Sequence, residues 1–259
     1  MGWECEVTDK MRLLRNHFVF FAFLVFCFLF FLPAPLRAEK TVVSVDGSLM
    51  LSSAYLWRGE KECNLHVNPN VALHWGGFTL ETYSYLSLDG KYKEIDWDIS
   101  YTIGDFSLHI ADYYAHLADS PLGENYFTWE KGKTGHSDEV ALIYQSSSIP
   151  LNVRWFTFFW GNWLPEDEGR PGKLSFSSFL ELESYYDFKR FGKASLTLGF
   201  SVLKGAYTDY TKYFMPVHIG LTYEKSFDLG PVSIPLRVGI VYNPYRKTCL
   251  AEAAFGFAF

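Results

Sequence analysis

The sequence predicts an all-β protein: a transmembrane, antiparallel, up-and-down β-barrel of twelve strands that follows a cleaved N-terminal signal peptide. Three observations lead to this fold class. Apolar and polar residues alternate with period two along most of the chain after Lys40, and two is the period of a β-strand. Short turns alternate with longer loops between these strands, as in outer-membrane barrels. The apolar phase of the strands also avoids basic residues away from the strand ends.

Residues 1–38 have the three parts of a secretory signal peptide. Arg12 and Arg15 precede a run from Phe18 to Leu32 in which every side chain is apolar, and small Ala38 lies shortly beyond it. A signal anchor is the alternative, but the run is short for a membrane-spanning helix. We expect cleavage after Ala38, and Met11 offers a better-placed start than Met1. Residues 39–259 then form the barrel.

Twelve segments of the mature chain show the strand pattern. Between Glu94 and Ile103, for example, Ile95, Trp97 and Ile99 share one face, while Asp96 and Asp98 share the other. The segments cover residues 45–58, 66–75, 78–88, 93–103, 106–116, 138–146, 150–161, 174–188, 193–204, 213–226, 231–243 and 248–259.

The links between the predicted strands alternate in length. Gly76-Gly77 and Gly104-Asp105 are tight links, whereas His116–Ser137 and Gly161–Lys173 are the longest. Outer-membrane barrels have short periplasmic turns and longer extracellular loops. Both termini are therefore expected on the periplasmic side of the outer membrane, which requires an even number of strands.

A soluble β-sandwich is the main alternative, because it also alternates apolar and polar residues. Away from strand ends, however, the apolar phase contains no Lys or Arg, and Asp112 is its only acid. A cation facing lipid at mid-depth costs about 2–4 kcal/mol, whereas the solvent face of a sandwich needs no such avoidance. Aromatic residues also make up 19% of the chain and gather at the predicted strand ends, as in barrel girdles. These features favour the barrel.

The mature chain resembles the TorF-like putative porins, a family of Gram-negative outer-membrane barrels. The resemblance rests on Ser52–Gly59, Glu94-Ile95-Asp96, Asp112-Tyr113-Tyr114, Tyr126-Phe127, His136, Glu139 and Asn243-Pro244. It implies an integral outer-membrane protein with a porin-like function and no established substrate. The C-terminal Phe255–Phe259 segment likewise looks like the signal read by the barrel assembly machinery.

The polar phase of the strands predicts an acidic lumen. Its acids outnumber its bases, so some of them must meet water, bind cations or take up protons. The sequence therefore predicts a hydrated, weakly cation-preferring pore for ions or small solutes, constricted by inward aromatic rings such as Phe158 and Phe179. The predicted lumen residues are Arg58, Glu81, Glu94, Asp96, Asp98, Glu139, Arg154, Glu181, Glu183, Glu224, Arg237 and Glu252.

Two alternatives to an open pore remain. A structural or ligand-binding barrel would be closed by the His116–Ser137 loop. A lipid hydrolase is less favoured, because Ser107 and His109 point by phase into the lumen, away from lipid. We therefore expect no enzyme activity. The oligomeric state stays open.

The sequence indicates no cofactor, metal or nucleic-acid site. It contains no CxxC, GxGxxG or P-loop pattern, and its net charge of −6 does not suit phosphate binding. His136, Asp138 and Glu139 are interpreted as a solvated rim rather than metal ligands. Cys63 and Cys249 are expected at the same barrel face, beside the closing seam, where an oxidising periplasm would join them in a disulfide.

Overall fold

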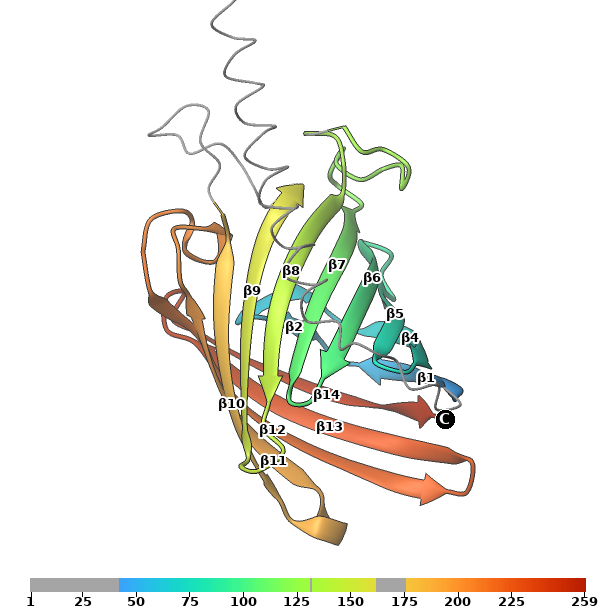
Figure 1. The fold of residues 1–259 in the computed structure, drawn as a ribbon. Helices are drawn as coiled ribbons and strands as arrows, with labels where there is room; N and C mark the ends of the chain where they lie inside the picture. The colour runs from blue at the N-terminus through green and yellow to red at the C-terminus, as the bar shows by residue number, and fades with distance from the viewer. Residues whose placement is uncertain (1–41, 131, 162–175) are drawn as a thin grey trace, which may run out of the picture. The chain divides into compact units, whose positions relative to one another are not determined.

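The computed structural model describes residues 42–130, 132–161 and 176–259, which form one closed antiparallel barrel (Figure 1). The predicted signal peptide, residues 1–38, lies outside the described residues. Twelve strands make up the wall, as predicted. They are β1 (Val43–Ser52), β4 (His66–Trp75), β5 (Phe78–Ser87), β6 (Tyr92–Ile103), β7 (Phe106–Leu117), β8 (His136–Gln145), β9 (Leu151–Gly161), β10 (Ser178–Asp187), β11 (Lys193–Ser201), β12 (Met215–Leu229), β13 (Val232–Asn243) and β14 (Thr248–Ala258).

The barrel closes through β1, which pairs with β14 on one side and with β4 on the other. Ser52 opposes Ala254 of β14 and His66 of β4, while Ser48 opposes Ala258 and Asn70. Closure leaves no unpaired strand edge in the wall, which is the condition for a β-sheet to cross a lipid bilayer.

The outer face of the wall is apolar. Leu142 is 53% exposed and Ile99 51% exposed, and Leu221, Ile240 and Phe255 are exposed on the same face. A soluble protein rarely exposes so continuous an apolar surface, and such a surface marks a membrane contact. The barrel is therefore transmembrane. Among the described residues, no helix has both the length and the apolar character needed to span a bilayer.

The two ends of the barrel differ. Short links, including Gly76-Gly77 and Gly104-Asp105, join the strands at one end, where β1 begins and β14 finishes beside it. This end is called the turn end. The opposite end carries the longer links, among them residues 118–135 and 202–214, and is called the loop end. The alternation of link lengths expected from the sequence is thus confirmed.

The predicted first strand, residues 45–58, is wrong in its second half. The wall strand β1 stops at Ser52, and the chain then folds into a small hairpin of β2 (Tyr55–Trp57) and β3 (Glu60–Cys63). This hairpin pairs with no wall strand as a sheet neighbour. We call residues 53–65 the inner hairpin. Periodicity missed it because Tyr55 and Trp57 continue the alternation of Leu49 and Leu51, although they pack against the aromatic interior rather than lipid.

Candidate functional site

The inner face of the wall carries the predicted lumen residues. Strand registers join Glu81 to Asp98, Arg154 to Glu181 and Glu224 to Arg237 as direct cross-strand neighbours. Glu94, Asp96, Glu139, Glu183 and Glu252 occupy the same inward phase, opposite to the exposed apolar residues. Arg58 also lies inside the barrel, but on the inner hairpin rather than on the wall.

The basic residues of the wall are paired with acids beside them. Arg154 contacts Glu181 at 2.5 Å and Glu183 at 2.6 Å. Arg237 lies 3.1 Å from Glu252 and 3.9 Å from Glu224. Each of these arginines therefore offsets part of the charge of the two acids beside it.

Among the described residues, the predicted lumen acids without a Lys or Arg partner lie on two neighbouring strands. Glu81 of β5 accepts hydrogen bonds from Asn70 and Tyr83. On β6, Asp98 contacts His109 at 3.0 Å, and Asp96 is 2% exposed with its Oδ1 atom unpartnered among the described residues. The fourth acid of the group is Glu94. We call Glu81, Glu94, Asp96 and Asp98 the acidic stripe.

The inner hairpin is fixed to the wall by a buried ion pair. Arg58 donates to both carboxylate oxygens of Glu139, at 2.5 and 2.7 Å, and to the Tyr207 hydroxyl at 2.5 Å. Its guanidinium also lies 4.0 Å from the centre of the Phe156 ring, which adds a cation–π contact. The charge of Glu139 keeps the pKa of Arg58 above its ordinary value against the opposing effect of burial. The hairpin therefore places the positive charge of Arg58 beside the negative charge of Glu139.

The tip of the inner hairpin is a tight turn formed by Arg58 and Gly59. Both tip residues have positive φ, 46° at Arg58 and 96° at Gly59, as a two-residue type I′ turn requires. A Cβ atom on Gly59 would lie 2.0 Å from the carbonyl oxygen of Val217. The tip therefore sits directly against β12, three strands away from β1 around the barrel.

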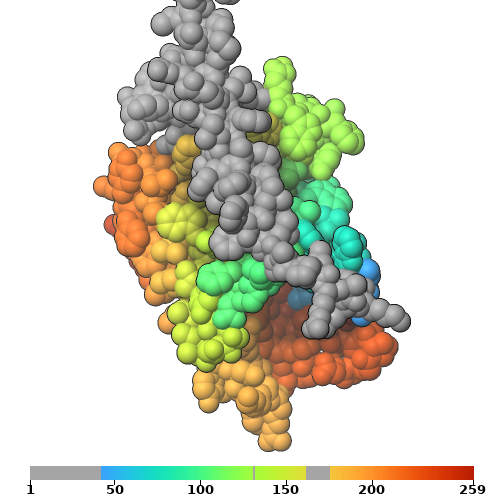
Figure 2. Space-filling view, in the orientation of Figure 1, coloured from blue at the N-terminus to red at the C-terminus, as the bar shows by residue number. Residues whose placement is uncertain are grey.

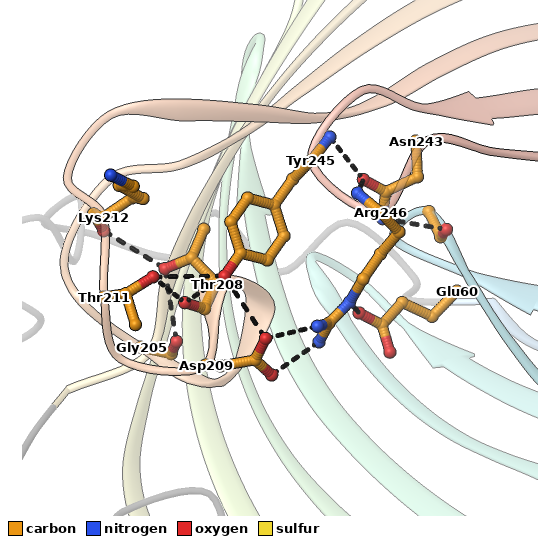
Figure 3. A network of polar contacts seen from close by, with 10 residues as sticks. Glu60, Gly205, Thr208, Asp209, Thr211, Lys212, Asn243, Tyr245 and Arg246 are labelled. Carbon is orange, nitrogen blue, oxygen red and sulfur yellow. Dashed lines mark hydrogen bonds and ion pairs between the residues drawn. The ribbon is translucent and has the colours of Figure 1, made fainter.

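A second set of contacts holds the hairpin to the loop end (Figure 3). Arg246, in the β13–β14 link, contacts Glu60 of β3 at 3.0 Å and forms a two-point ion pair with Asp209. Asp209 follows the short 3₁₀ helix η2 (Ala206–Thr208). The hydrogen bond from Arg246 holds the pKa of the Asp209 carboxyl below its ordinary value. Tyr245 joins the same network by donating to the Thr208 carbonyl at 3.0 Å.

Aromatic rings fill the space around the hairpin. Trp57 lies near Tyr113, Phe158 and Tyr207, with ring centres 6.0–6.2 Å apart. Phe158 is 1% exposed. The predicted aromatic constriction therefore exists, and the hairpin completes it.

Two cavities lie on either side of this aromatic layer. The loop-end cavity has a volume of about 210 Å³ and includes Tyr55, Glu62 and Glu94 in its wall. The turn-end cavity is larger, about 520 Å³, and is lined by charged residues such as Lys193 and Arg237. The hairpin therefore narrows the path into the lumen from the loop end.

The loop between β7 and β8 lies across the rim of the barrel and does not fill the lumen. Trp129 stacks on His136 with ring centres 3.9 Å apart, and His136 contacts Asp112 at 2.9 Å. Both His136 and Asp112 belong to the outward phase of their strands. Ser120 and Leu122, by contrast, line the loop-end cavity. Within the part of the chain that the structure describes, the inner hairpin thus fills more of the lumen than the β7–β8 loop, which the sequence had offered as the closing segment of the alternative, closed barrel.

The three residues considered as metal ligands are not brought together. His136 and Asp138 lie in the outward phase of β8, while Glu139 points inward, and no group of metal-ligating side chains occurs among the described residues. Ser107 and His109 share the inward phase of β7, as predicted, and His109 contacts Asp98.

The predicted disulfide is absent, since Cys63 and Cys249 are both free. Cys63 is buried against Tyr55 and Tyr92 inside the barrel. Cys249 is exposed and pairs in register with Tyr242, a residue of the outer face. The prediction placed both thiols at one rim, because it extended the first wall strand to residue 58 and put Cys63 in an extracellular loop. Because the hairpin turns inward, the wall separates the two sulfur atoms.

Sequence reasoning also missed three residues of the interior, Tyr207, Glu62 and Tyr92. Tyr207 lies in a link between strands, and Glu62 lies in a segment taken for a loop. The Arg-Gly pair that precedes Glu62 was the available signal, because a glycine after a polar residue between short alternating segments favours a tight hairpin.

Comparison with known proteins finds similar barrels only among solved structures. The NanC porin matches with 11% identity and a TM-score of 0.44, over 83% of this chain and 99% of that one. An outer membrane channel from Pseudomonas putida F1 matches with 10% identity and a TM-score of 0.41, over 87% and 98%. The CymD monoaromatic hydrocarbon channel matches with 10% identity and a TM-score of 0.38, over 88% and 90%. At TM-scores below 0.5 these likenesses carry no functional argument.

No family model matches the chain. No curated protein matches it either.

Proposed function

We propose that this protein is a narrow outer-membrane channel for ions and small solutes, with a weak preference for cations. The acidic stripe is the observation that carries the proposal. Glu81, Glu94, Asp96 and Asp98 lie together on β5 and β6 without a Lys or Arg partner in the described part of the chain, whereas the wall arginines Arg154 and Arg237 are already paired. Carboxylates along a pore raise the local concentration of cations and repel anions.

The inner hairpin makes the proposed channel narrow at the loop end. Trp57, Tyr113 and Phe158 leave little space beside it. The stripe runs past this layer, because Glu94 lines the loop-end cavity and Asp98 lies four positions further along β6 towards the turn end. A cation following the stripe meets acidic groups on both sides of the constriction. The resemblance to TorF-like putative porins and the apolar outer face agree with this function.

In the proposed membrane orientation, the loop end faces the cell exterior and both ends of the mature chain face the periplasm. Long loops outside and short turns inside are typical of outer-membrane barrels. The C-terminal Phe255–Phe259 segment would then be the part presented to the barrel assembly machinery. Phe255 and Phe257 both occupy the outward, lipid-facing phase of β14.

A closed, ligand-binding barrel is the second candidate function. Two observations favour a closed barrel. The Arg58–Glu139 ion pair is buried and holds the hairpin firmly at the loop end, and Phe158 beside the hairpin is only 1% exposed. A closed barrel and a narrow channel share every contact described above, and they differ only in whether ions pass.

Reversal-potential measurements in planar bilayers separate these functions. In a salt gradient, the wild type should give a small conductance and a reversal potential on the cation side. The double variant Asp96→Asn, Asp98→Asn should shift the reversal potential towards anions. Asp119→Asn, in the exposed β7–β8 loop, removes a carboxylate outside the lumen and should change nothing. A wild type without conductance supports the closed barrel, and an unchanged reversal potential in the double variant removes the role of the stripe.

A further inference from the structure

The loop-end cavity has the composition of a binding site for a positively charged organic molecule. Its wall contains the carboxylates of Glu62 and Glu94 and no Lys, Arg or His side chain. The remaining lining residues are Tyr55, Trp57, Tyr92, Tyr113, Ala115, Leu117, Ser120, Leu122, Gly135, Ser137 and Phe158. We call this cavity the chamber. A cation placed in it meets two acids and no competing base among the described residues.

The two acids of the chamber differ in how they are held. Glu94 is 5% exposed and accepts hydrogen bonds from the hydroxyls of Tyr55, at 3.1 Å, and Tyr92. These hydroxyls fix the orientation of its carboxylate. Glu62 is half-buried, and among the described residues its carboxylate has no hydrogen-bond or ion-pair partner. Glu62 is therefore the group available to a ligand.

The nearest arginine does not neutralise these acids. Arg58 directs both of its terminal nitrogens at Glu139 and lies over the Phe156 ring. A further acid lies close to the chamber. Asp96 follows Glu94 by two positions on the inner face of β6, is 2% exposed and keeps its Oδ1 atom unpartnered among the described residues. The chamber thus adjoins a third acidic side chain.

Aromatic rings form the rest of the chamber wall. Tyr55 and Tyr92 lie with their ring centres 6.2 Å apart, and Trp57, Tyr113 and Phe158 surround the opposite side at 5.8–6.2 Å from one another. Aromatic faces attract ammonium groups through their quadrupoles, and cages of such rings recognise quaternary ammonium ligands. Inorganic ions gain less from such a wall, because they retain their water. The wall therefore favours an organic cation.

The volume of the chamber sets the size of that cation. A cavity of about 150 Å³ holds benzene, so the chamber, at about 210 Å³, accommodates a trimethylammonium group with a short tail. We propose that the chamber binds a small organic cation, an amine or quaternary ammonium compound, between Glu62 and the surrounding rings. For transport the proposal rests on the proposed channel function, and it makes the chamber the recognition site of that channel. Binding itself does not require conduction.

Calorimetric titration with choline tests the site. The full folded protein in detergent micelles is titrated with choline and with 3,3-dimethyl-1-butanol, its neutral isostere. We expect binding of one choline per chain, at least about tenfold tighter than the isostere. Equal affinity for the two compounds, or no binding of choline, overturns the proposal.

Two variants assign the binding to the chamber. Glu62→Gln keeps the shape of the side chain and removes its charge, so choline should bind about tenfold more weakly. Glu130→Gln is the matched control, since Glu130 lies exposed in the β7–β8 loop and pairs only with Lys133, and its affinity should equal that of the wild type. Unchanged affinity in Glu62→Gln overturns the assignment, and the melting temperature of each variant shows that it is folded.

The pH dependence gives a readout that a structural role would not produce. Burial raises the pKa of the Glu62 carboxyl to about 7, and the charges of Glu94 and Glu60 act in the same direction. Glu62 thus gains its charge between pH 6 and pH 8, and choline should bind more tightly at the higher pH. Glu94 also lines the chamber and is a second acid that can take up a proton, so Glu62→Gln should reduce the pH dependence of choline affinity without removing it. A pH dependence as steep in Glu62→Gln as in the wild type contradicts the proposal.

Choline binding and ion conductance are separate outcomes, so the failure of one proposal can be told from the failure of the other. Choline binding without any bilayer conductance keeps the chamber and removes the channel, whereas conductance without choline binding does the reverse.

Discussion

Arg58 and Glu139, 81 positions apart in the chain, form a two-point ion pair that crosses the barrel interior. Both side chains are buried, with exposed fractions of 6% and 2%. Two buried charges cost several kcal/mol each in desolvation and are retained only with good geometry and further hydrogen bonds. Tyr207 and Tyr113 supply such bonds. The pair therefore holds the inner hairpin in one position.

Replacing one partner of this ion pair should lower the free energy of unfolding more than replacing both partners. Glu139→Gln or Arg58→Met alone leaves a buried charge without its partner, and each should lower the free energy of unfolding by about 3–5 kcal/mol. The double variant leaves no charge and should lose less than either single variant. Urea unfolding of all four proteins measures the coupling. Strictly additive losses would show that the two residues do not interact.

Gly59→Ala should displace the hairpin tip. The added methyl group would meet the Val217 carbonyl at 2.0 Å, at a backbone φ of +96°. Gly90→Ala is the matched control, because Gly90 also has positive φ, +72°, but nothing lies within 4 Å of its Cβ position. We expect limited proteolysis to cut residues 53–65 in Gly59→Ala only. Cleavage of residues 53–65 in both variants would mean that a side chain at positive φ, and not the contact with Val217, causes the effect.

Trp129→Ala should loosen the β7–β8 loop without opening the lumen. The Trp129 ring stacks on His136, a residue of the outer face, whereas the hairpin keeps its own anchors. The single-channel conductance should equal that of the wild type. A conductance that rises in Trp129→Ala would mean that the loop, as the sequence first suggested, closes the pore.

The two cysteines should remain thiols. A maleimide should label Cys249 in the folded protein, and Cys63 only after unfolding, because burial raises the pKa of the Cys63 thiol to about 11 and little reactive thiolate forms. Two labels per unreduced, unfolded chain confirm the absence of a disulfide. No label under those conditions would restore the Cys63–Cys249 bond.

The sequence predicted the wall well because the wall obeys one local rule. Lipid outside and charge inside impose a strict period of two, so Trp97 and Ile99 alternate with Asp96 and Asp98 as expected. The number of strands followed from the alternation of short and long links. The inward phase of Arg154, Arg237 and the acids came from the same rule.

The interior was harder to predict because its contacts are not local. Tyr55 and Trp57 have the alternation of lipid-facing residues, and only the partners of Arg58 on β8 and in η2 show that the chain turns inward. The disulfide failed for the same reason, since its two cysteines were placed on a topology without the inner hairpin. Which loop blocks a barrel depends on packing that a single sequence does not display.

Single-channel conductance with and without the inner hairpin shows directly whether this barrel is a channel that the hairpin narrows. Ser52 and His66 are register partners, so an Asn-Gly turn can replace residues 53–65 and join β1 to β4 as a tight hairpin. We expect a small, cation-preferring conductance in the wild type and a larger conductance, still cation-preferring, in the shortened protein. Equal conductance in the two proteins, or none in either, would contradict a channel narrowed by this hairpin.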